Sequence, residues 1–444
     1  MTFLLPDEVK KIIEMLEANG HEAYIVGGCV RDCFLDRVPS DWDITTSAKP
    51  EEVKQIFPFT IDTGLKHGTV TVRMNHRSFE VTTYRIDGEY TDGRHPDDVT
   101  FTDNLYEDLK RRDFTINAMA YNEREGLVDR FNGQEDLNDK IIRAVGEPRE
   151  RFTEDALRMM RAVRFAAQLD FTIDKDTFDA ITELSYTLRK VSAERIRTEF
   201  EKTLVSSHPE FIRQVYETHL TTAFIPEFDI MMKTEQHSPH HDYTVGEHTI
   251  RVVKEVPEEK VIRLAALLHD VAKPMCKTTD SDGRDHFYGH PEMGEELSAD
   301  ILRRLKYDND TIYLVKKLVR YHDERPENSL KSVRHALSKI GTDIFPALFD
   351  LKRADTLAQS DYQREEKLQA IDDFERNYND IKDAEEAVSV KDLMINGTDL
   401  ISMGYTRGPE IGSILAKLLD HVLDHPEDNN KRRLKELVST VVRQ

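Results

Sequence analysis

The sequence predicts an α+β fold, with a small mixed β-sheet and its helices at the N-terminus and an all-helical remainder. Strand-like runs rich in β-branched residues lie before residue 140, and from about residue 141 the apolar residues recur at helical spacing. A chain of 444 residues also exceeds what one hydrophobic core organises. We therefore expect an N-terminal domain over 1–140, a helical neck over 141–205, a helical body over 206–385 and a helical tail over 386–444.

The composition predicts a globular protein of a reducing compartment. The chain is 39% hydrophobic and 33% charged, and no apolar run is long enough to span a membrane. Three cysteines are too few for a disulfide framework, and the N-terminus lacks the layout of a signal peptide, so we expect a cytoplasmic location and no membrane partner. The net charge of −22 argues against a protein that coats nucleic acid, and no DNA partner is expected. A locally basic cleft could still hold one RNA end.

The N-terminal domain opens with an amphipathic helix over 7–18, followed by a strand over 24–26. This strand ends at Gly27-Gly28, where two glycines let the backbone bend tightly and approach a bulky anion closely. Arg31 follows within one helical turn, so that a cation stands beside exposed amides. Gly28 and Arg31 are therefore candidates for a phosphate cradle.

Asp41 and Asp43 form the candidate metal site. On a strand, residues i and i+2 face the same side, so the two carboxylates would stand close together with Trp42 turned away. Like charges this close need a cation between them, and oxygen ligands beside a phosphate cradle suit Mg²⁺ bound to a nucleotide. Two β-rich runs between residues 68 and 83 predict a hairpin, in which Glu80 is either a third carboxylate or a solvent-facing strand residue.

The segment 87–103 is rich in glycine, aspartate and proline, which predicts a mobile loop. The sequence Arg111-Arg112-Asp113 follows it. Paired arginines before an aspartate suit contacts to a triphosphate and to ribose hydroxyls, with Arg112 and Asp113 as the candidates. A surface cluster of ion pairs is the alternative.

The glycine turn, the paired aspartates and the RRD segment, in this order, resemble the nucleotidyltransferase head of class II CCA-adding enzymes and bacterial poly(A) polymerases. The resemblance implies that Asp41 and Asp43 are catalytic and bind Mg²⁺, and that the substrates are CTP, ATP and the acceptor end of tRNA. Full CCA-adding enzymes carry a flexible loop at the place of residues 87–103, which implies competence to add the final A. The segments 129–137 and 191–204 match the family further.

The neck carries a second informative stretch, TEDALRMMRAVRF. Thr153 can cap a helix whose acidic and basic residues lie along one stripe: Asp155, Arg158, Arg161 and Arg164. Cytosine and adenine both present an exocyclic amine beside a bare ring nitrogen. Asp155 can accept from the amine while Arg158 donates to the ring nitrogen, and uracil and guanine reverse that pattern. An ion pair on a solvated helix face is the alternative.

This stretch resembles the nucleotide-selecting EDxxR motif of class II CCA-adding enzymes, which implies that Arg161 and Arg164 hold the triphosphate or the RNA end. In the neck helix over 191–204, Arg195 and Glu199 stand four residues apart and are expected to pair with each other. The tail has an apolar helical face between residues 411 and 422. Its sequence resembles the C-terminal region of the family, which carries the tRNA body.

Histidine and aspartate residues between about 235 and 360 predict a second metal site. Imidazole and carboxylate groups together suit a transition metal, Mn²⁺ or Mg²⁺. An adjacent histidine and aspartate cannot both be buried on one helical face, but both can reach a metal at the end of a helix. The order H…HD…D resembles the HD-domain metal phosphohydrolases. The implied ligands are His248, His269, Asp270 and Asp355, with His290 and His322 as further candidates.

Another HD pair, within residues 240–242, lacks an apolar helix before it and is interpreted as a decoy or a minor contributor. The HD resemblance implies phosphatase or 2′,3′-cyclic phosphodiesterase activity that could trim damaged RNA ends. A degenerate HD fold kept as a scaffold is the alternative.

For the whole chain, the prediction is template-independent addition of C, C and A to tRNA. The rivals are a poly(A) polymerase of the same superfamily, an HD phosphohydrolase with a nucleotide-sensing head, and an RNA-binding scaffold.

Overall fold

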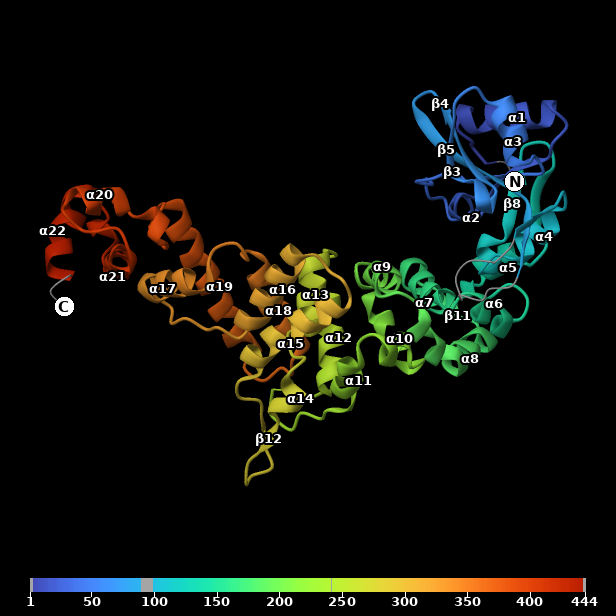
Figure 1. Ribbon diagram of the computed structural model, residues 1–444. Coiled ribbons are helices and arrows are strands. Elements are labelled where there is room, and N and C mark those ends of the chain that lie inside the picture. Colours follow the sequence, from blue (N-terminus) through green and yellow to red (C-terminus); the bar gives the residue numbers. More distant parts are fainter. Residues whose placement is uncertain (1–2, 89–98, 241, 442–444) are drawn as a thin grey trace. The chain divides into compact units, whose positions relative to one another are not determined.

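The computed structural model describes residues 3–88, 99–240 and 242–441, and its architecture is the predicted α+β fold (Figure 1). Contacts divide the chain into two compact units, residues 1–229 with 304–306 and residues 230–303 with 307–444. The predicted N-terminal domain and neck lie in the first unit. Residues 206–229, which we expected in the body, also belong to the first unit. None of the helices that the structure describes is both long and apolar enough to cross a membrane.

A seven-stranded mixed sheet forms the centre of the N-terminal domain, in the order β3-β4-β5-β2-β1-β8-β9. Its β2–β5 pair is parallel and its other pairs are antiparallel. The predicted hairpin is β4–β5, in which Met74 pairs with Arg77. The strands of this sheet are β1 Ala23–Val26, β2 Ile44–Thr46, β3 Thr60–Gly64, β4 Thr69–Met74, β5 Arg77–Thr83, β8 Met119–Asn122 and β9 Gly126–Asp129.

Short helices accompany this sheet. The amphipathic α1 buries the four apolar residues that predicted it, Val9, Ile12, Ile13 and Leu16. The helices are α1 Asp7–Ala18, α2 Gly28–Phe34, α3 Pro50–Ile56, α4 Leu105–Lys110 and α5 Gly133–Asn138. Strands β6 Arg85–Asp87 and β7 Val99–Phe101 pair antiparallel. The predicted loop over 87–103 therefore includes the end of β6 and all of β7, and its residues 89–98 are outside the described residues.

The neck is helical, but its informative stretch is not one helix. Asp155 has extended backbone, with φ −141° and ψ 104°, and separates α6 from α7. Thr153 lies in the last turn of α6, where its hydroxyl donates to the Arg149 carbonyl, so its predicted role as an N-cap is wrong. The neck elements are α6 Pro148–Glu154, α7 Leu157–Leu169, α8 Lys175–Leu184, α9 Ala193–Leu204 and α10 Ile212–Glu217, with a short parallel pair of β10 Ile141–Ile142 and β11 Thr172–Ile173.

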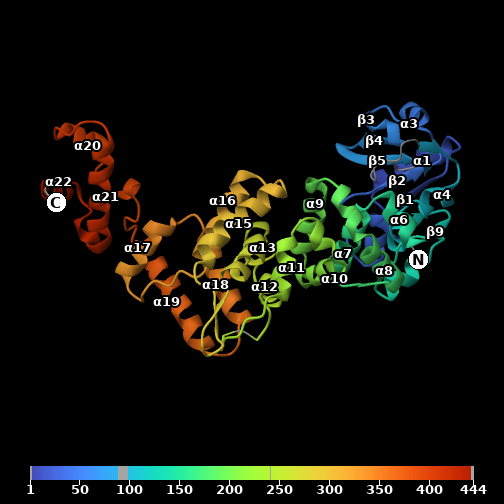
Figure 2. The same ribbon diagram turned by 60° about the horizontal axis from the view of Figure 1, so that its bottom comes forward.

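The second unit is helical apart from a short hairpin. Its central helix α13 is buried at every position from Ile262 to Leu268 and packs against α12, α16 and α18, as expected for a helix inside a bundle (Figure 2). The elements are α11 Pro226–Lys233, which crosses the boundary between the units, α12 Val245–Glu255, α13 Lys260–Leu268, α14 Lys273–Cys276, β12 Thr278–Thr279, β13 Asp285–His286, α15 His290–Arg304, α16 Asn309–Tyr321, α17 Leu330–Ile340, α18 Ala347–Ala358 and α19 Arg364–Asp383.

The tail has its own apolar cluster, built on the predicted helical face. Of the six predicted residues, Ile411 is partly buried against the cluster and the other five are buried within it: Ile414, Leu415, Leu418, Leu419 and Val422. The helices here are α20 Gly397–Ser402, α21 Pro409–Asp424 and α22 Lys431–Val441.

Candidate active site and candidate metal cluster

Asp41 and Asp43 lie in the segment just before β2, not on the strand itself. Both side chains are exposed, whereas Trp42 between them is 7% exposed, so the two carboxylates face one side and the indole faces the core. They line a cavity of about 580 Å³. Glu80 lines the same cavity, because the parallel register that pairs Ile44 with Val81 brings the preceding residues of β2 and β5 together.

The three carboxylates make this cavity strongly negative. The pKa of Asp43 is raised, first because the surrounding protein desolvates the group and then because Glu80 and Asp41 repel its charge, while Arg112 acts in the opposite direction. A divalent cation would remove this repulsion. The donor set consists of carboxylate oxygens alone, which fits a hard cation such as Mg²⁺.

The glycine turn beside β1 allows a close approach by Arg112. Gly27 has φ +80°, and a Cβ atom there would lie only 3.0 Å from the Arg112 Nη1. Arg31 is oriented by its own contacts, since its Nη1 donates to Asn117 Oδ1 at 2.8 Å and its Nε donates to Asp32 at 2.9 Å. Two guanidinium groups therefore stand close to the turn that contains Gly27 and Gly28, which is an arrangement suited to phosphate.

Asp113 is tethered to the neck. It is 9% exposed, and its carboxylate accepts hydrogen bonds from the Phe114 backbone amide at 2.9 Å and from Arg161 Nε at 2.7 Å. Burial opposes its ionisation, but Arg161 and Arg158 hold its pKa at about 2. Asp113 is thus a buried anion that joins the N-terminal domain to α7.

Asp155 lies at the junction of α6 and α7 and keeps hydrogen-bonding capacity. One carboxylate oxygen accepts from the Leu157 amide at 3.0 Å, and the other lies 2.8 Å from Arg195 Nη2. Each carboxylate oxygen offers two lone pairs, so each oxygen of Asp155 can still accept one further donor, such as an exocyclic amine.

Arg158 is held by three acceptors. Its Nη1 donates to Glu154 at 2.6 Å and to the Arg151 carbonyl at 3.2 Å, and its Nη2 donates to the Arg111 carbonyl at 3.1 Å. A guanidinium has five N–H groups, so two remain beyond these three bonds among the described residues. Asp155 and Arg158 are therefore positioned by other groups, and among the described residues Asp155 keeps acceptor capacity while Arg158 keeps two N–H donors.

The arginines further along α7 have different surroundings. Arg164 is 8% exposed, its Nε lies 2.9 Å from Glu199, and burial lowers its pKa to about 10. The predicted pair between Arg195 and Glu199 is wrong, because Arg195 pairs with Asp155 and Glu199 with Arg164. The packing of α7 against α9 places the buried charges of Arg164 and Glu199 opposite each other, and an unpaired buried charge is costly.

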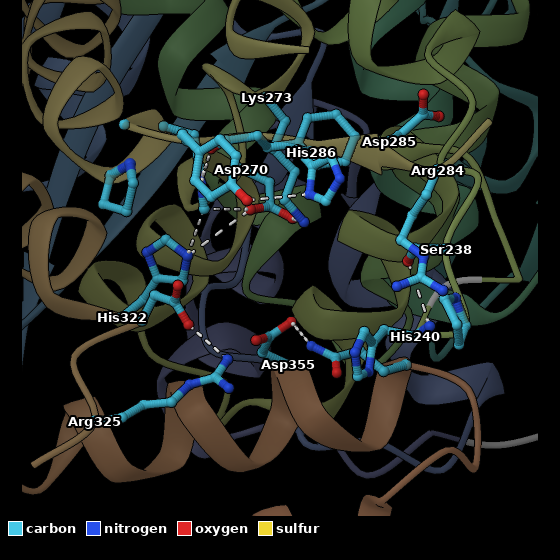
Figure 3. Close-up of a pocket in the computed structure, with 18 of the residues that line it drawn as sticks. Ser238, His240, Asp270, Lys273, Arg284, Asp285, His286, His322, Arg325 and Asp355 are labelled. Carbon is cyan, nitrogen blue, oxygen red and sulfur yellow. Dashed lines mark hydrogen bonds and ion pairs between the residues drawn. The ribbon is translucent and has the colours of Figure 1, made fainter. Parts of the chain in front are cut away.

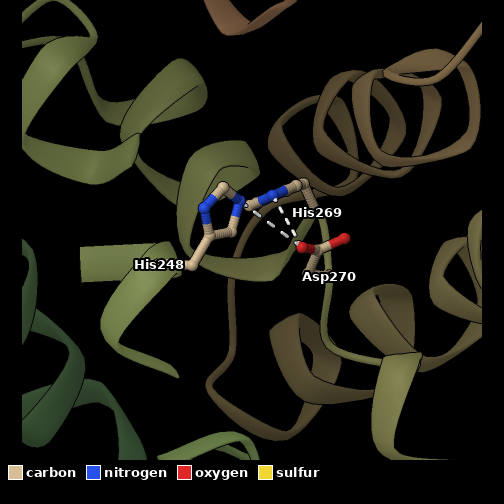
Figure 4. Close-up of side chains that lie close together, drawn as sticks. All are labelled: His248, His269 and Asp270. Carbon is tan, nitrogen blue, oxygen red and sulfur yellow. Dashed lines mark ion pairs between the residues drawn. The ribbon is translucent and has the colours of Figure 1, made fainter. Parts of the chain in front are cut away.

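The second cluster joins the ends of several helices. His248 comes from α12, and His269 and Asp270 end the apolar α13, all 1% exposed (Figure 4). The Nε2 atoms of His248 and His269 lie 3.7 and 3.1 Å from Asp270 Oδ2. Asp355 on α18 has its Oδ1 3.0 Å from His248 Nε2. The predicted convergence of these four side chains is what the structure shows.

His290 and His322 approach Asp270 from the other side. His290 begins α15 and His322 follows α16. Their Nε2 atoms lie 3.4 and 3.8 Å from Asp270 Oδ1, and 3.2 Å from each other. Figure 3 shows His322 with Asp270 and Asp355 around the cavity that contains this cluster.

Backbone carbonyls set the tautomers of these histidines. The Nδ1 atoms of His269, His290 and His322 lie 2.7–2.8 Å from the carbonyl oxygen three residues earlier. Each Nδ1–H donates there, which leaves the Nε2 lone pair directed at Asp270, as in metal-ligating histidines. Burial and the neighbouring imidazoles lower the pKa of His322 to about 4, which keeps that ring neutral.

The donor set fits a divalent transition metal. His269 Nε2 and Asp270 Oδ1 are buried without a hydrogen-bond partner among the described residues. Two Nε2 lone pairs only 3.2 Å apart, on His290 and His322, repel each other unless a cation lies nearby. Imidazole nitrogens with carboxylates are typical ligands for transition metals.

The cluster lies in a cavity of about 520 Å³ whose walls carry additional cations. Lys273 has its Nζ 2.7 Å from Asp270 Oδ2. We did not anticipate its role, although a lysine one helical turn after an HD pair could have indicated it. His240 also lines this cavity, whereas His241 lies outside the described residues.

Three family descriptions match successive parts of the chain. Residues 23–143 match the poly A polymerase head domain, residues 170–232 the RNA and SrmB-binding site of polymerase A, and residues 289–438 the tRNA nucleotidyltransferase domain 2. The first covers the sheet with the three carboxylates, and the third covers His290, His322 and Asp355.

Curated proteins and solved structures are similar along the chain. The CCA-adding enzyme of Streptococcus thermophilus is 35% identical over 450 residues, 98% of each chain. The CCA-adding enzyme of Lactobacillus helveticus is 53% identical over 230 residues, which is 50% of this chain and 57% of that enzyme; several other curated relatives are also matched over about half their length. The crystal structure of the Bacillus stearothermophilus CCA-adding enzyme in complex with CTP superposes with a TM-score of 0.72 at 29% identity, covering 99% of this chain and 98% of that one.

Proposed function

The chain belongs to the family of CCA-adding enzymes, and we propose that it adds C, C and A to the 3′ end of tRNA from CTP and ATP without a template. The observation that carries this proposal is the convergence of Asp41, Asp43 and Glu80 on one cavity in the same sheet as the glycine turn. Carboxylates beside phosphate-binding groups are what nucleotidyl transfer requires.

In this proposal, Asp41 and Asp43 hold Mg²⁺, with Glu80 as a third oxygen donor. When bound, Mg²⁺ offsets the charge of the triphosphate and orients its α-phosphate. The amides of Gly27 and Gly28, with Arg31 and Arg112, bind the remaining phosphates. The 3′-hydroxyl of the tRNA attacks the α-phosphorus in line, the α–β anhydride bond breaks, and pyrophosphate leaves.

Asp155 and Arg158 choose the base. The free acceptor of Asp155 takes the exocyclic amine of cytosine or adenine, and a free N–H of Arg158 reaches the adjacent ring nitrogen. Arg161 also contributes by holding Asp113 and thereby the orientation of α7. Arg164 is buried against Glu199, which favours a structural role over a direct contact with the triphosphate.

The partner is tRNA, recognised mainly by the shape and backbone of its acceptor end. The cytoplasmic location that the sequence predicts agrees with such a substrate and stays a prediction.

The test is product analysis on a tRNA transcript that lacks its terminal CCA. With CTP alone we expect two added nucleotides, with CTP and ATP three, and with ATP alone none. Long adenosine tails from ATP alone would instead identify a poly(A) polymerase. A transcript that already ends in CCA is the control and should not be extended.

We further propose that the histidine cluster is a metal-dependent phosphohydrolase site. The observation that favours it is the set of imidazole Nε2 atoms directed at buried Asp270 within a large cavity. A bound divalent cation would lower the pKa of a coordinated water and withdraw charge from a phosphoryl oxygen. We expect His269→Ala to abolish phosphoesterase activity and leave nucleotide addition unchanged.

The matched control is His335→Ala, because His335 pairs with Asp424 away from the cluster. Loss of both activities in His269→Ala would contradict the separation of the two sites. A purified protein without phosphoesterase activity in any divalent metal would support the alternative of a degenerate scaffold.

A further inference from the structure

The guanidinium of Arg31 is held by three side chains from different parts of the first unit. Its Nε and Nη2 donate to Asp32 Oδ1 at 2.9 and 2.8 Å, and its Nη1 donates to Asn117 Oδ1 at 2.8 Å. The ring centroid of Phe165 lies 5.1 Å from Arg31 Cζ. Asn117 ends a short 3₁₀-helix, and Phe165 belongs to α7. Two side chains far along the chain therefore help to set the direction of this cation.

Asn117 contacts a cation and an anion through one amide. The residue is 6% exposed, its Oδ1 accepts from Arg31, and its Nδ2 donates to Asp113 Oδ1 at 3.3 Å. An amide suits this position because it accepts on one side and donates on the other. A carboxylate here would place two like charges side by side, and an apolar side chain would deprive both neighbours of this partner.

Phe165 has three guanidinium groups around its ring. The Cζ atoms of Arg31, Arg161 and Arg164 lie 5.1, 5.3 and 4.0 Å from the ring centroid, and the residue is 6% exposed. A guanidinium within about 6 Å of an aromatic centroid is attracted by the electrons of the ring face. Arg31 belongs to α2, and the other two arginines belong to α7. The ring thus holds cations from both the N-terminal domain and the neck.

We propose that Asn117 and Phe165 are positioning residues of the nucleotide site, which hold the Arg31 guanidinium ready for the triphosphate. This inference rests on the proposed nucleotidyl transfer and adds two residues that act through Arg31. Asn117 also links this cation to Asp113, which Arg161 connects to the neck.

A held guanidinium binds phosphate more tightly than a free one. An arginine side chain loses rotamer freedom when it is fixed, and here folding has already fixed it. This cost is therefore not repeated when the triphosphate binds. CTP and ATP carry the same triphosphate, so release of Arg31 should weaken the binding of both nucleotides equally. Base choice should be unaffected, because it depends on Asp155 and Arg158.

Nucleotide binding and nucleotide addition test the proposal together in the full chain. Asn117→Ala should raise the Kd and the KM of CTP and of ATP about tenfold, the scale of one hydrogen bond to a charged group. Phe165→Leu keeps an apolar side chain but removes the ring, and should raise these constants about threefold. In both variants kcat should change less than KM, because the lost interaction is made with the bound nucleotide as well as in the transition state. Calorimetry measures Kd, and addition to truncated tRNA measures KM and kcat.

A double-variant cycle separates positioning from a general structural role. Because both residues act through Arg31, Asn117→Ala and Phe165→Leu should each have at most about a twofold further effect in an Arg31→Ala background. The KM for tRNA and the preference for CTP over UTP should stay at the values of the parent protein. Additive losses overturn the proposal, and so does a loss that differs between CTP and ATP.

Asn122→Ala and Phe200→Leu are the matched controls. Asn122 is buried and donates to the carbonyl of Ala23 at 3.2 Å, at the first residue of β1, whereas the glycine turn follows the last. Phe200 is buried in α9 and packs against Phe224 with ring centroids 5.0 Å apart. Each control should lower the Tm and leave the KM of both nucleotides unchanged. An equal rise of KM in the controls overturns the proposal, because lost packing would then explain it.

Failure of the positioning and failure of the proposed function are distinguishable. A parent protein that binds CTP and ATP but adds nothing to truncated tRNA would contradict the proposed function, and the Kd comparison would still test the positioning. A parent that adds C, C and A, with unchanged Kd and KM in Asn117→Ala and Phe165→Leu, would overturn the positioning alone.

Discussion

The two candidate metal sites differ in exposure and in chemistry. Asp41, Asp43 and Glu80 offer only oxygen to an open cavity, and two of them are two residues apart in the sequence. The histidine cluster offers nitrogen and oxygen from buried side chains between His248 and Asp355. The first arrangement suits a hard cation that arrives and leaves with each nucleotide, and the second suits a tightly held transition metal.

This difference has an electrostatic cause. In the N-terminal cavity, desolvation and then repulsion by Glu80 and Asp41 keep the pKa of Asp43 raised, so binding of Mg²⁺ with the substrate relieves an unfavourable charge. In the cluster, burial opposes the ionisation of Asp270, but His269 and Lys273 lower its pKa well below the usual value. The carboxylate of the cluster thus has a cation, Lys273, beside it before any metal arrives.

The largest expected effect is a loss of nucleotide addition with no change in phosphoesterase activity. Asp43→Ala removes a metal ligand and should lower nucleotide addition by on the order of 10³-fold or more. Phosphoesterase activity in the same preparation should be unchanged. Asp62→Ala is the matched control, because Asp62 is an exposed aspartate that pairs with Lys54. Unimpaired addition in Asp43→Ala would mean that the N-terminal unit is not catalytic and would favour a nucleotide sensor.

A smaller effect is expected on base choice, which belongs to the first site alone. Asp155→Ala removes the acceptor for the exocyclic amine, so the preference for CTP over UTP should fall by about 10–100-fold, the range of one good base contact. Competition assays with both nucleotides on truncated tRNA measure this ratio. Arg195→Ala removes only the partner of Asp155 and should have a weaker effect. Equal losses for CTP and UTP would assign Asp155 a structural role.

Metal exchange compares the sites directly. After chelation, Mg²⁺ should restore nucleotide addition fully, because carboxylate oxygens suit it. Phosphoesterase activity should recover about tenfold better with Mn²⁺ or Co²⁺, because imidazole favours transition metals. Metal titrations of both activities in one sample provide the measurement. An identical order of metals at both sites would contradict the contrast in donor chemistry.

The smallest effect concerns stability. The pKa of Asp43 is raised by folding, so its stabilising contribution is present at acidic pH and is lost as pH rises through the folded pKa. Asp43→Asn should therefore raise the metal-free Tm by about 1–2 °C at pH 7 and have no effect below about pH 3.5. Calorimetric scans across this pH range measure the difference, with Asp62→Asn as the control. A lower Tm at pH 7 would mean that the repulsion is already compensated.

Much of the first site could be predicted from short segments. Gly27-Gly28, Asp41 and Asp43 lie within about twenty residues, and strand alternation placed the two acids on one side, although they lie just before β2 and not on it. The largely apolar α13, which His269 follows directly, was equally predictable, because its composition indicates a buried helix. Local pattern succeeds where the neighbours in space are also neighbours in sequence.

The partners of charged groups were less predictable. The neck stretch was expected as one helix, but Asp155 interrupts it, where its side chain accepts from the Leu157 amide. Helical spacing suggested a pair between Arg195 and Glu199, but Glu199 pairs with Arg164 on α7 and Arg195 pairs with Asp155 at the junction of α6 and α7. Burial selects such long-range partners because an unpaired charge inside the protein costs more than an exposed i,i+4 pair gains.

The sequence by itself determined the family, the α+β fold class and the list of aspartate and histidine candidates, because these depend on residue type and local spacing. Only the tertiary structure decided that Glu80 joins the acids, that Lys273 contacts Asp270, and that the two oxygens of Asp270 face different imidazoles. The reason is geometric: strand register and the packing of helix ends set distances between residues far apart in the chain, and sequence spacing does not contain those distances.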